Sequence, residues 1–418
     1  MGVMILLRRL RGVFRKYGLG GGLLRLRRHL RTSVLQALGL PALLQKKALR
    51  RLLRSELAGK ARVIVWRSSF GFRVPLYQRP QQMARQLASL GCLVVYEANG
   101  STDETDSFRL LEDGLLLFHF GCRPLRTLLL QELERSGLPR YLQIYSTNYE
   151  MDLRELEQWQ RRGYGIIYEY VDHLSPAISA TRELPKKVLD KYRFAMTHPE
   201  VTVVATAELL RQDVLQKRGG ENLILASNGV DYAFFQHWEA YDFEPAFRAI
   251  LQQGRPIVCY YGALASWVDY GILNDISADG RFSLVLIGVS YDGSMERELQ
   301  KNERCFFLGP RDYRVLKYYA READVLILPF RINAVTRSTN PVKLFEYMAL
   351  HKPIVSSGID ECRRYESVLI AEYRGAFIRR IEEALALRQD EAYLALLDKE
   401  ARENDWREKA RTLIEGLR

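Results

Sequence analysis

Residues 338–358 read STNPVKLFEYMALHKPIVSSG, a stretch in which a short helix is followed at once by a short strand. Asn340 is a good N-cap and Pro341 suits the first helical position, so the pattern predicts a helix through LFEYMAL. The helix should end before Lys352-Pro353, and IVSS then reads as a buried strand. A helix that leads directly into a buried strand is typical of parallel α/β sheets.

Lys343 and Glu346 lie on one face of this predicted helix, within its first turn and a half. A lysine there sits beside free backbone N–H groups and the positive end of the helix dipole. That is a poor place for a cation unless an anion occupies the site. Alternatively, Lys343 and Glu346 are an ordinary solvated pair on the helix surface. The pattern of the remaining sequence is needed to choose between the two interpretations.

The rest of the chain repeats the alternation of strands and helices. A first series of buried-strand runs occupies residues 62–66, 92–100, 115–120, 141–146, 165–172, 201–206 and 222–229. A second series occupies residues 256–264, 282–288, 305–309, 325–330 and 353–358. The fold class predicted is therefore α/β, with two Rossmann-like, doubly wound parallel sheets. Ligands bind beyond the carboxyl ends of such strands, and the helix that begins near Asn340 starts at that edge.

The length of 418 residues is too great for one ordinary core. The patterns predict four parts, which are a basic amphipathic helical arm (1–60), a first Rossmann-like domain (61–240), a second one (241–375) and C-terminal helices (376–418). The last part is helical throughout, and in a two-domain architecture it could cross back over the first domain.

The positive charge of the chain belongs to the arm. Residues 1–60 hold 15 of the 62 basic residues and one of the 50 acidic residues, a net charge of +14. The remaining 47 basic and 49 acidic residues give −2. Three amphipathic segments of the arm combine apolar stripes with arginine and lysine, which suits an anionic membrane surface. The alternatives are packing on the body or another subunit, RNA binding and a cleaved targeting sequence, of which a secretory signal fits badly; we expect no nucleic-acid partner.

Several classes of protein are disfavoured by composition. The five cysteines contain no C-x-x-C pair, which indicates reduced, cytosolic thiols, and the six histidines show no metal-ligand spacing. No run of 18 apolar residues exists, so we expect no conventional membrane-spanning helix.

The motifs, taken in order, resemble the two-domain GT-B glycosyltransferases, specifically the bacterial group 1 branch. The matching segments are PLYQRPQQMARQLASLG (75–91), IIYEYVDHLS (166–175), ASNGVD (226–231), YYGALASWVDY (260–270), NPVKLFEYMALHKPIVSS (340–357) and RENDWREKARTLIEGL (402–417). The resemblance covers about residues 61–418 and leaves the arm outside it.

The resemblance implies a nucleotide-diphosphate sugar bound mainly by the second domain. Glu346 would accept hydrogen bonds from the ribose hydroxyls, and Lys343 with the helix start at Asn340 would hold the diphosphate. Gly262 would let the backbone approach the diphosphate closely. Cations and N–H groups there would stabilise the charge that grows on the leaving diphosphate.

Two departures from the group 1 pattern concern this site. Many members carry a second glutamate where this chain has Ser338, and an arginine and a lysine where it has ALASWVD (263–269). Arg337 is the candidate to supply the missing positive charge. No D-x-D motif occurs among the aspartates, so we expect a metal-independent enzyme without a bound cofactor.

Asp172 and His173 are the candidates for a catalytic base. They stand at the end of the strand run at 165–172 in the domain that would face the donor, and an inverting transfer needs such a group for the acceptor hydroxyl proton. Alternatively, Asp172 is the N-cap of a helix over LSPAISAT (174–181) or orients a loop. A retaining mechanism would not need this base.

The resulting hypothesis is a metal-independent glycosyltransferase on the cytoplasmic face of the cell membrane. It would move a sugar from a UDP- or GDP-linked donor to a lipid-linked or cell-surface glycan acceptor, for polysaccharide biosynthesis in the cell envelope. The alternatives are a catalytically degenerate GT-B scaffold and a sugar-nucleotide epimerase, and the membrane arm argues against the latter.

Overall fold

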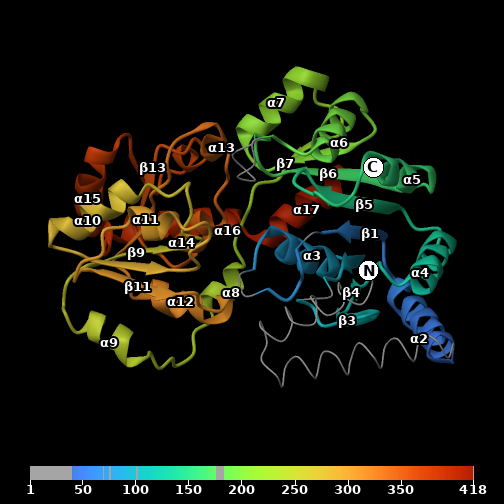
Figure 1. Ribbon diagram of the computed structural model, residues 1–418, viewed down its shortest axis with the longest axis horizontal. Helices are drawn as coiled ribbons and strands as arrows, with labels where there is room; N and C mark the ends of the chain where they lie inside the picture. Colours follow the sequence, from blue (N-terminus) through green and yellow to red (C-terminus); the bar gives the residue numbers. More distant parts are fainter. Residues whose placement is uncertain (1–39, 69, 75–76, 100–101, 176–182, 418) are drawn as a thin grey trace, which may run out of the picture. The chain divides into compact units, whose positions relative to one another are not determined.

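The computed structural model describes residues 40–417 except 69, 75–76, 100–101 and 176–182 (Figure 1). The chain forms two compact units. The smaller unit comprises residues 1–59 and 119–137, and the larger comprises residues 60–118 and 138–418.

The described part of the smaller unit is a pair of helices. Helix α2 (Leu40–Leu57) packs against α4 (Arg123–Arg135), and Arg50 Nε lies 3.3 Å from Glu132 Oε1 across the pair. A helix therefore exists within the predicted arm; residues 1–39 of the arm lie outside the described residues.

The larger unit contains two sheets. The strands of the first are β1 (Arg62–Arg67), β2 (Cys92–Glu97), β3 (Phe108–Glu112), β4 (Leu115–Phe118), β5 (Arg140–Tyr145), β6 (Gly165–Tyr170), β7 (Thr202–Ala205) and β8 (Leu223–Leu225). Their order is β3-β4-β2-β1-β5-β6-β7-β8, and every pair except β3–β4 is parallel. Its helices in the larger unit are α3 (Arg79–Ser89), α5 (Leu153–Arg161), α6 (Lys186–Thr197) and α7 (Glu208–Arg218).

The expectation of a wholly parallel first sheet is wrong at its edge. Strand β3 was not predicted, and it pairs antiparallel with β4. Its sequence FRLLE has only one neighbouring strand and no buried residue, so it lacks the continuous apolar run by which the buried parallel strands are recognised.

The second sheet is parallel throughout, with the order β11-β10-β9-β12-β13-β14. Its strands are β9 (Ile257–Tyr261), β10 (Ser283–Ile287), β11 (Cys305–Gly309), β12 (Val325–Leu328), β13 (Ile354–Ser357) and β14 (Val368–Ala371). The strand order reverses between β9 and β12, which is where an open parallel sheet forms a ligand crevice at its carboxyl edge. Strand β14 was not predicted.

Helices accompany the second sheet and connect it to the first. Helices α8 (Tyr232–Gln236) and α9 (Pro245–Leu251) lie between the two sheets in sequence. The remaining helices are α10 (Tyr270–Asp279), α11 (Ser294–Glu298), α12 (Tyr313–Arg321), α13 (Ala334–Arg337), α14 (Val342–Ala349), α15 (Phe377–Leu387), α16 (Glu391–Glu403) and α17 (Trp406–Gly416), with the 3-10 turns η2 (Cys362–Arg364) and η3 (Arg374–Ala376).

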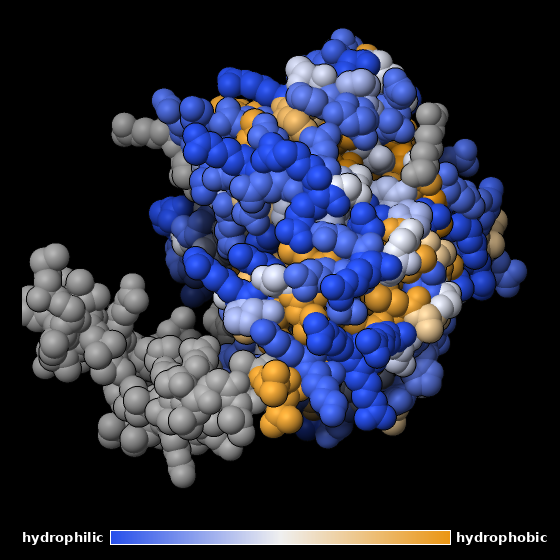
Figure 2. Space-filling model, turned by 90° about the vertical axis from the view of Figure 1, so that its right-hand side faces the viewer, coloured by the Kyte–Doolittle hydropathy of each residue, from blue (hydrophilic) through white to orange (hydrophobic). Residues whose placement is uncertain are grey.

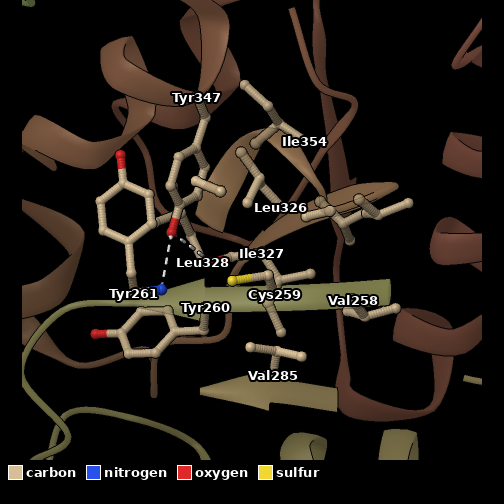
Figure 3. Packing of buried hydrophobic residues seen from close by; sticks show 14 of the residues in the cluster. Val258, Cys259, Tyr260, Tyr261, Val285, Leu326, Ile327, Leu328, Tyr347 and Ile354 are labelled. Atoms are coloured by element: carbon tan, nitrogen blue, oxygen red, sulfur yellow. Dashed lines mark hydrogen bonds between the residues drawn. The ribbon is translucent and has the colours of Figure 1, made fainter. Parts of the chain in front are cut away.

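The core of the second sheet is formed mainly by aliphatic and aromatic side chains (Figure 3). Tyr347 of α14 packs its ring edge-on against Tyr261 of β9, with the ring centroids 5.0 Å apart. Its hydroxyl donates to Ile327 O (3.4 Å) and accepts from Tyr261 N (3.5 Å). Helix α14 is thereby fixed over β9 and β12, the two strands that flank the reversal.

The C-terminal helix α17 returns to the first sheet and packs against α3 and β8. Trp406, which is fully buried, belongs to the same apolar cluster as Ile64 of β1 and Met83 of α3. Among the described residues, no helix combines the length and apolar character needed to cross a bilayer. The face shown in Figure 2 is mostly hydrophilic, with hydrophobic residues in smaller areas between.

Candidate functional site

Two glycines form the floor of the candidate site at the carboxyl ends of β9 and β10. Gly262 follows β9 with φ +146°, and its N–H donates to Ile287 O at 2.8 Å. Gly288 follows β10 with φ +150°, and a Cβ added there would lie 1.8 Å from Gly262 O. Only glycine suits both the backbone angle and the spacing, so the two turns touch through their backbones.

Lys343 extends over this floor from the second residue of α14. A Cβ added to Gly262 would lie 2.1 Å from Lys343 Cε, so the missing side chain of Gly262 makes room for the lysine. Burial lowers the pKa of Lys343, and nearby Glu346 opposes the shift. Within the described part of the chain the ammonium group has no hydrogen-bond partner. It is therefore free to bind an anion.

Glu346 lies one turn further along α14 and is only 4% exposed, so the alternative of a solvated pair is wrong. Its Oε2 accepts a hydrogen bond from the Tyr261 hydroxyl at 2.7 Å. Burial raises the pKa of Glu346 to about 7, while the hydrogen bond from Tyr261 and the charge of Lys343 oppose the rise. A buried carboxylate with one donor has unused acceptor capacity, which suits a hydroxyl-rich ligand.

Asn340 does not cap α14, contrary to the prediction. The helix begins at Val342 with Pro341 in the N-cap position, and no side chain caps it. Asn340 is buried, and its Oδ1 accepts instead from the backbone N–H of Asn228 at 3.0 Å. The Asn340 side chain therefore bonds Asn228 of the first sheet domain (the first sheet with its helices) instead of the N–H groups of its own helix. The first backbone N–H groups of α14 are left without a side-chain acceptor.

Arg337 and Ser338 occupy the end of the short helix α13. Arg337 is exposed and makes no hydrogen bond or ion pair with the described residues through its side chain. Ser338 is buried, and its hydroxyl donates to Ala334 O (3.2 Å) and Val335 O (2.9 Å). Ser338 thus satisfies carbonyl groups of its own helix.

Asp172 and His173 follow β6 in the first sheet domain. Burial of its carboxyl group raises the pKa of Asp172 to about 7, although the residue keeps some exposed surface. His173 Nδ1 is buried and unpartnered among the described residues. The helix that Asp172 was alternatively expected to cap falls mostly within residues 176–182, outside the described residues.

The structure therefore places Lys343 against Gly262 and Glu346 one turn further along α14, bonded to Tyr261, the residue before Gly262. Asn340 is buried just before α14. No hydrogen bond or ion pair between described residues joins this group to Asp172, His173 or Arg337. The group offers an ammonium, free helical N–H groups and a carboxylate beside a floor without side chains. Such a set can bind an anion and a polyhydroxyl group of the same ligand.

Two residues of this site were missed from the sequence. Tyr261, which holds Glu346, looks like the last core residue of β9, but a buried tyrosine hydroxyl needs a partner. Gly288 ends the strand run at 282–288 as Gly262 ends its own, and that parallel was the available signal. In the described ranges, no group of three or more His, Cys, Asp or Glu residues is arranged to hold a metal ion.

Comparison with known sequences finds a family match within the second sheet domain and a longer match to a bacterial relative. Residues 256–386 match the family model described as "Glycosyl transferases group 1". A Bacillus subtilis (strain 168) protein named "Putative teichuronic acid biosynthesis glycosyltransferase TuaH" is 24% identical over 270 residues. That match spans 61% of this chain and 66% of the relative.

Comparison with solved structures extends over most of the chain. Sucrose-phosphate synthase from Thermosynechococcus elongatus superposes with a TM-score of 0.57 at 16% identity, covering 85% of this chain and 98% of the other. HepE from Anabaena, solved in complex with UDP, gives a TM-score of 0.59 at 16% identity, covering 85% and 99%. The predicted GT-B fold is confirmed.

Proposed function

Because this chain belongs to the group 1 glycosyltransferases of the GT-B fold, we propose that it transfers a sugar from a nucleoside-diphosphate sugar to a glycan acceptor. The teichuronic acid relative supports an acceptor in cell-envelope polysaccharide synthesis. The observation that carries the donor assignment is the position of Lys343 against Gly262, with the buried Glu346 one turn along the same helix, at the carboxyl edge of the second sheet.

The donor is proposed to bind with its diphosphate on Lys343 and the start of α14, and its ribose on Glu346. The backbone at Gly262 lets phosphate oxygens approach closely, and Arg337 supplies a second cation from the solvent side. The HepE structures with UDP and with UDP-glucose support a UDP-linked donor, and a GDP-linked donor is the other choice. We propose binding without a metal ion or resident cofactor.

Transfer forms a bond from an acceptor hydroxyl oxygen to the sugar C1 while the C1–O bond to the diphosphate breaks. Lys343 and the α14 N–H groups stabilise the charge that grows on the departing diphosphate. In an inverting reaction Asp172 takes the hydroxyl proton, and a pKa near 7 suits a base at neutral pH. His173 is the second candidate for this base.

Asp172→Asn tests that assignment. The variant should lose transfer by about 10²–10⁴-fold while nucleotide affinity is retained, because the base does not touch the nucleotide. In the wild type, activity should rise with pH through about 7 as Asp172 loses its proton. Near-normal turnover of Asp172→Asn would remove it from the mechanism.

The acceptor is proposed to be lipid-linked, with residues 1–60 holding the enzyme on the cytoplasmic face of the membrane. Helix α2 of this segment exposes Leu43 (71%) and Leu44 (67%). Its exposed basic residues are Lys47, Arg50, Arg51 and Arg54. Exposed leucine beside arginine and lysine is the composition that binds anionic lipid surfaces. Salt-sensitive binding of the full chain to anionic vesicles, absent with neutral vesicles, would support this.

A catalytically degenerate scaffold is the second candidate. Ser338 stands where many group 1 members have a glutamate, and its hydroxyl is occupied by α13 carbonyl groups. Retained nucleotide binding separates an enzyme from such a scaffold.

The deciding experiment is calorimetric titration of the full chain with UDP, GDP and ADP in the presence of EDTA. Micromolar binding of one nucleotide supports the proposed donor site and identifies its class. Binding by none of them contradicts the proposed donor site and favours the scaffold. Binding that appears only when a divalent metal replaces EDTA contradicts metal independence.

A further inference from the structure

A series of hydrogen bonds beside α14 joins the two sheet domains within the larger unit. Asn228, which follows β8, donates through its backbone N–H to Asn340 Oδ1 (3.0 Å) and through Nδ2 to Asn340 O (2.6 Å). Asn340 Nδ2 donates to Glu361 Oε2 (3.1 Å). We call Asn228, Asn340 and Glu361 the Asn340 cluster. It connects the segment before α14 to the first sheet domain in two directions.

One direction leads to the strand that ends near Asp172. Arg79, 4% exposed, donates through Nη1 to Ser227 O at 2.8 Å, and its Nε lies 2.9 Å from Glu169 Oε2. Glu169 belongs to β6, whose end is followed by Asp172. The Asn340 cluster is therefore tied to β6 by buried side chains.

The other direction leads to α7. The N-cap residue of α7 is Ala207, which has no side-chain oxygen to accept a bond from the first helical N–H groups. Glu361 Oε1 takes that role and accepts from Glu208 N at 2.6 Å. A carboxylate at a helix N-terminus is favourable for both the hydrogen bond and the helix dipole. A residue of the second sheet domain thus caps a helix of the first.

We infer that Glu361 is a positioning residue, which couples nucleotide binding on α14 to the first sheet domain by holding both Asn340 and the start of α7. This inference rests on the proposed nucleotide site. Asn340 lies two residues before α14, so a nucleotide that orders the first turn of α14 also orders Asn340. Ordered Asn340 strengthens the bond to Glu361, which in turn holds Glu208 N–H, and the effect reaches α7 without any contact of α7 with the nucleotide.

The coupling gives the Asn340 cluster a role in transfer beyond stability. Transfer requires donor and base to meet within about 1 Å of the productive geometry. The proposed donor contacts come from the second sheet domain and the proposed base from the first. Glu361 and Asn228 are the means by which the start of α14 is held relative to the first domain when the nucleotide arrives.

Glu361→Gln breaks one link of this path with little change in shape. Glu361 accepts at both oxygens from N–H donors, so a glutamine amide group must face one of the two donors and lose that bond. Asn228→Asp is the contrasting variant, because it breaks a bond on the side of Asn340 that leads to β6: its carboxylate would face Asn340 O and lose the bond from Nδ2.

Glu400→Gln is the matched control. Glu400 is 8% exposed against 4% for Glu361, and it also accepts one bond from a backbone N–H, that of Glu366, and one from a side chain, that of Ser367. Glu366 and Ser367 stand just before β14, and among the described residues no hydrogen bond joins them or Glu400 to α7. Glu400→Gln should lose as much stability as Glu361→Gln, but the nucleotide should still protect α7 in it.

The experiment is amide hydrogen exchange of the full chain, read by mass spectrometry with and without saturating UDP or GDP, whichever binds. In the wild type the nucleotide should slow exchange at residues 338–346 and, by at least about fivefold, at the first turn of α7, residues 208–211. In Glu361→Gln the nucleotide should still protect 338–346 but no longer 208–211, whereas in Asn228→Asp, which leaves the bonds of Glu361 in place, it should still protect both segments. Glu400→Gln should behave as the wild type.

The outcomes are separable. Nucleotide binding with protection of 208–211 intact in Glu361→Gln would overturn the inference and leave the proposed function standing. Failure of the wild type to bind either nucleotide would overturn the proposed function and this inference with it. Loss of protection also in Glu400→Gln would show a general loosening of the protein and overturn the assignment to Glu361.

Discussion

Glu169 in the first sheet domain and Glu346 in the second are both buried, at 0% and 4% exposed, but their surroundings differ. Glu169 pairs with the buried guanidinium of Arg79 and also accepts from Gln143, so both its oxygens are used. Among the described residues, Glu346 accepts a hydrogen bond from Tyr261 only, and it is not hydrogen-bonded to the nearby ammonium group of Lys343. A buried carboxylate with all partners supplied stabilises a fold, whereas one with too few partners is suited to a ligand.

The largest loss of stability is expected from breaking the buried ion pair between Arg79 and Glu169. Glu169→Ala leaves Arg79 buried without its counter-charge, so the free energy of unfolding should fall by about 3–5 kcal/mol. Urea denaturation of the full chain measures it. Glu157→Ala on α5, which breaks a surface pair with Arg161, is the control and should cost about 0.5 kcal/mol or less. A loss below about 1 kcal/mol for Glu169→Ala would contradict the view that Glu169, unlike Glu346, stabilises the fold.

The second prediction concerns the two glycines beside the Lys343 and Glu346 site, Gly262 and Gly288. Gly288→Ala places a Cβ against the backbone carbonyl of Gly262 at a φ that alanine avoids, and should cost about 2–4 kcal/mol of unfolding free energy. Gly309→Ala, with φ +72° and no atom within 4 Å of the added Cβ, isolates the backbone strain at about 1 kcal/mol. Thermal or urea unfolding compares them, and equal losses would contradict a packed floor.

Removing the charge of Glu346 should weaken the ligand and not the fold. Glu346→Gln should reduce affinity for the bound nucleotide by about 10–100-fold, or about 1.5–3 kcal/mol, because a charge-assisted bond to the ribose is lost. Its unfolding free energy at pH 7.5 should be unchanged or higher, since a buried charge is gone. Calorimetric titration measures the nucleotide affinity, and urea denaturation measures the unfolding free energy. Unchanged affinity would remove Glu346 from the site; Glu303→Gln, exposed in the same domain, is the control.

The smallest effect is a slope with pH. The pKa of Glu346 is raised from 4.5 in the unfolded chain to about 7 in the fold, so between these values the folded state holds the extra proton. Stability from this group is therefore present below pH 4.5 and lost as pH rises to about 7, with a slope approaching about 1 kcal/mol per pH unit. Denaturation of wild type and Glu346→Gln from pH 5 to 7.5 isolates it, because Asp172 titrates in both. Parallel curves would contradict the raised pKa.

The strands could be predicted because their signal is local. Runs such as RVIVW at 62–66 and VLILPF at 325–330 are apolar on both faces, as buried parallel strands must be. Strand β3 escaped because an edge strand with exposed arginine and glutamate lacks that signal. The N-cap prediction for Asn340 failed for a related reason, since local preference gave way to a partner 112 residues away.

Lys343 and Glu346 share a helix face by spacing alone, and the family pattern includes Gly262, so the sequence by itself determined the fold class and these candidate residues. Only the tertiary structure decided that Tyr261 holds Glu346, that Lys343 lies over Gly262, and that Glu361 caps a helix of the other sheet domain. Periodicity reports neighbours within one helix or strand. Hydrogen-bond partners of buried groups are set instead by which elements the packed sheets bring together, and that information is not local.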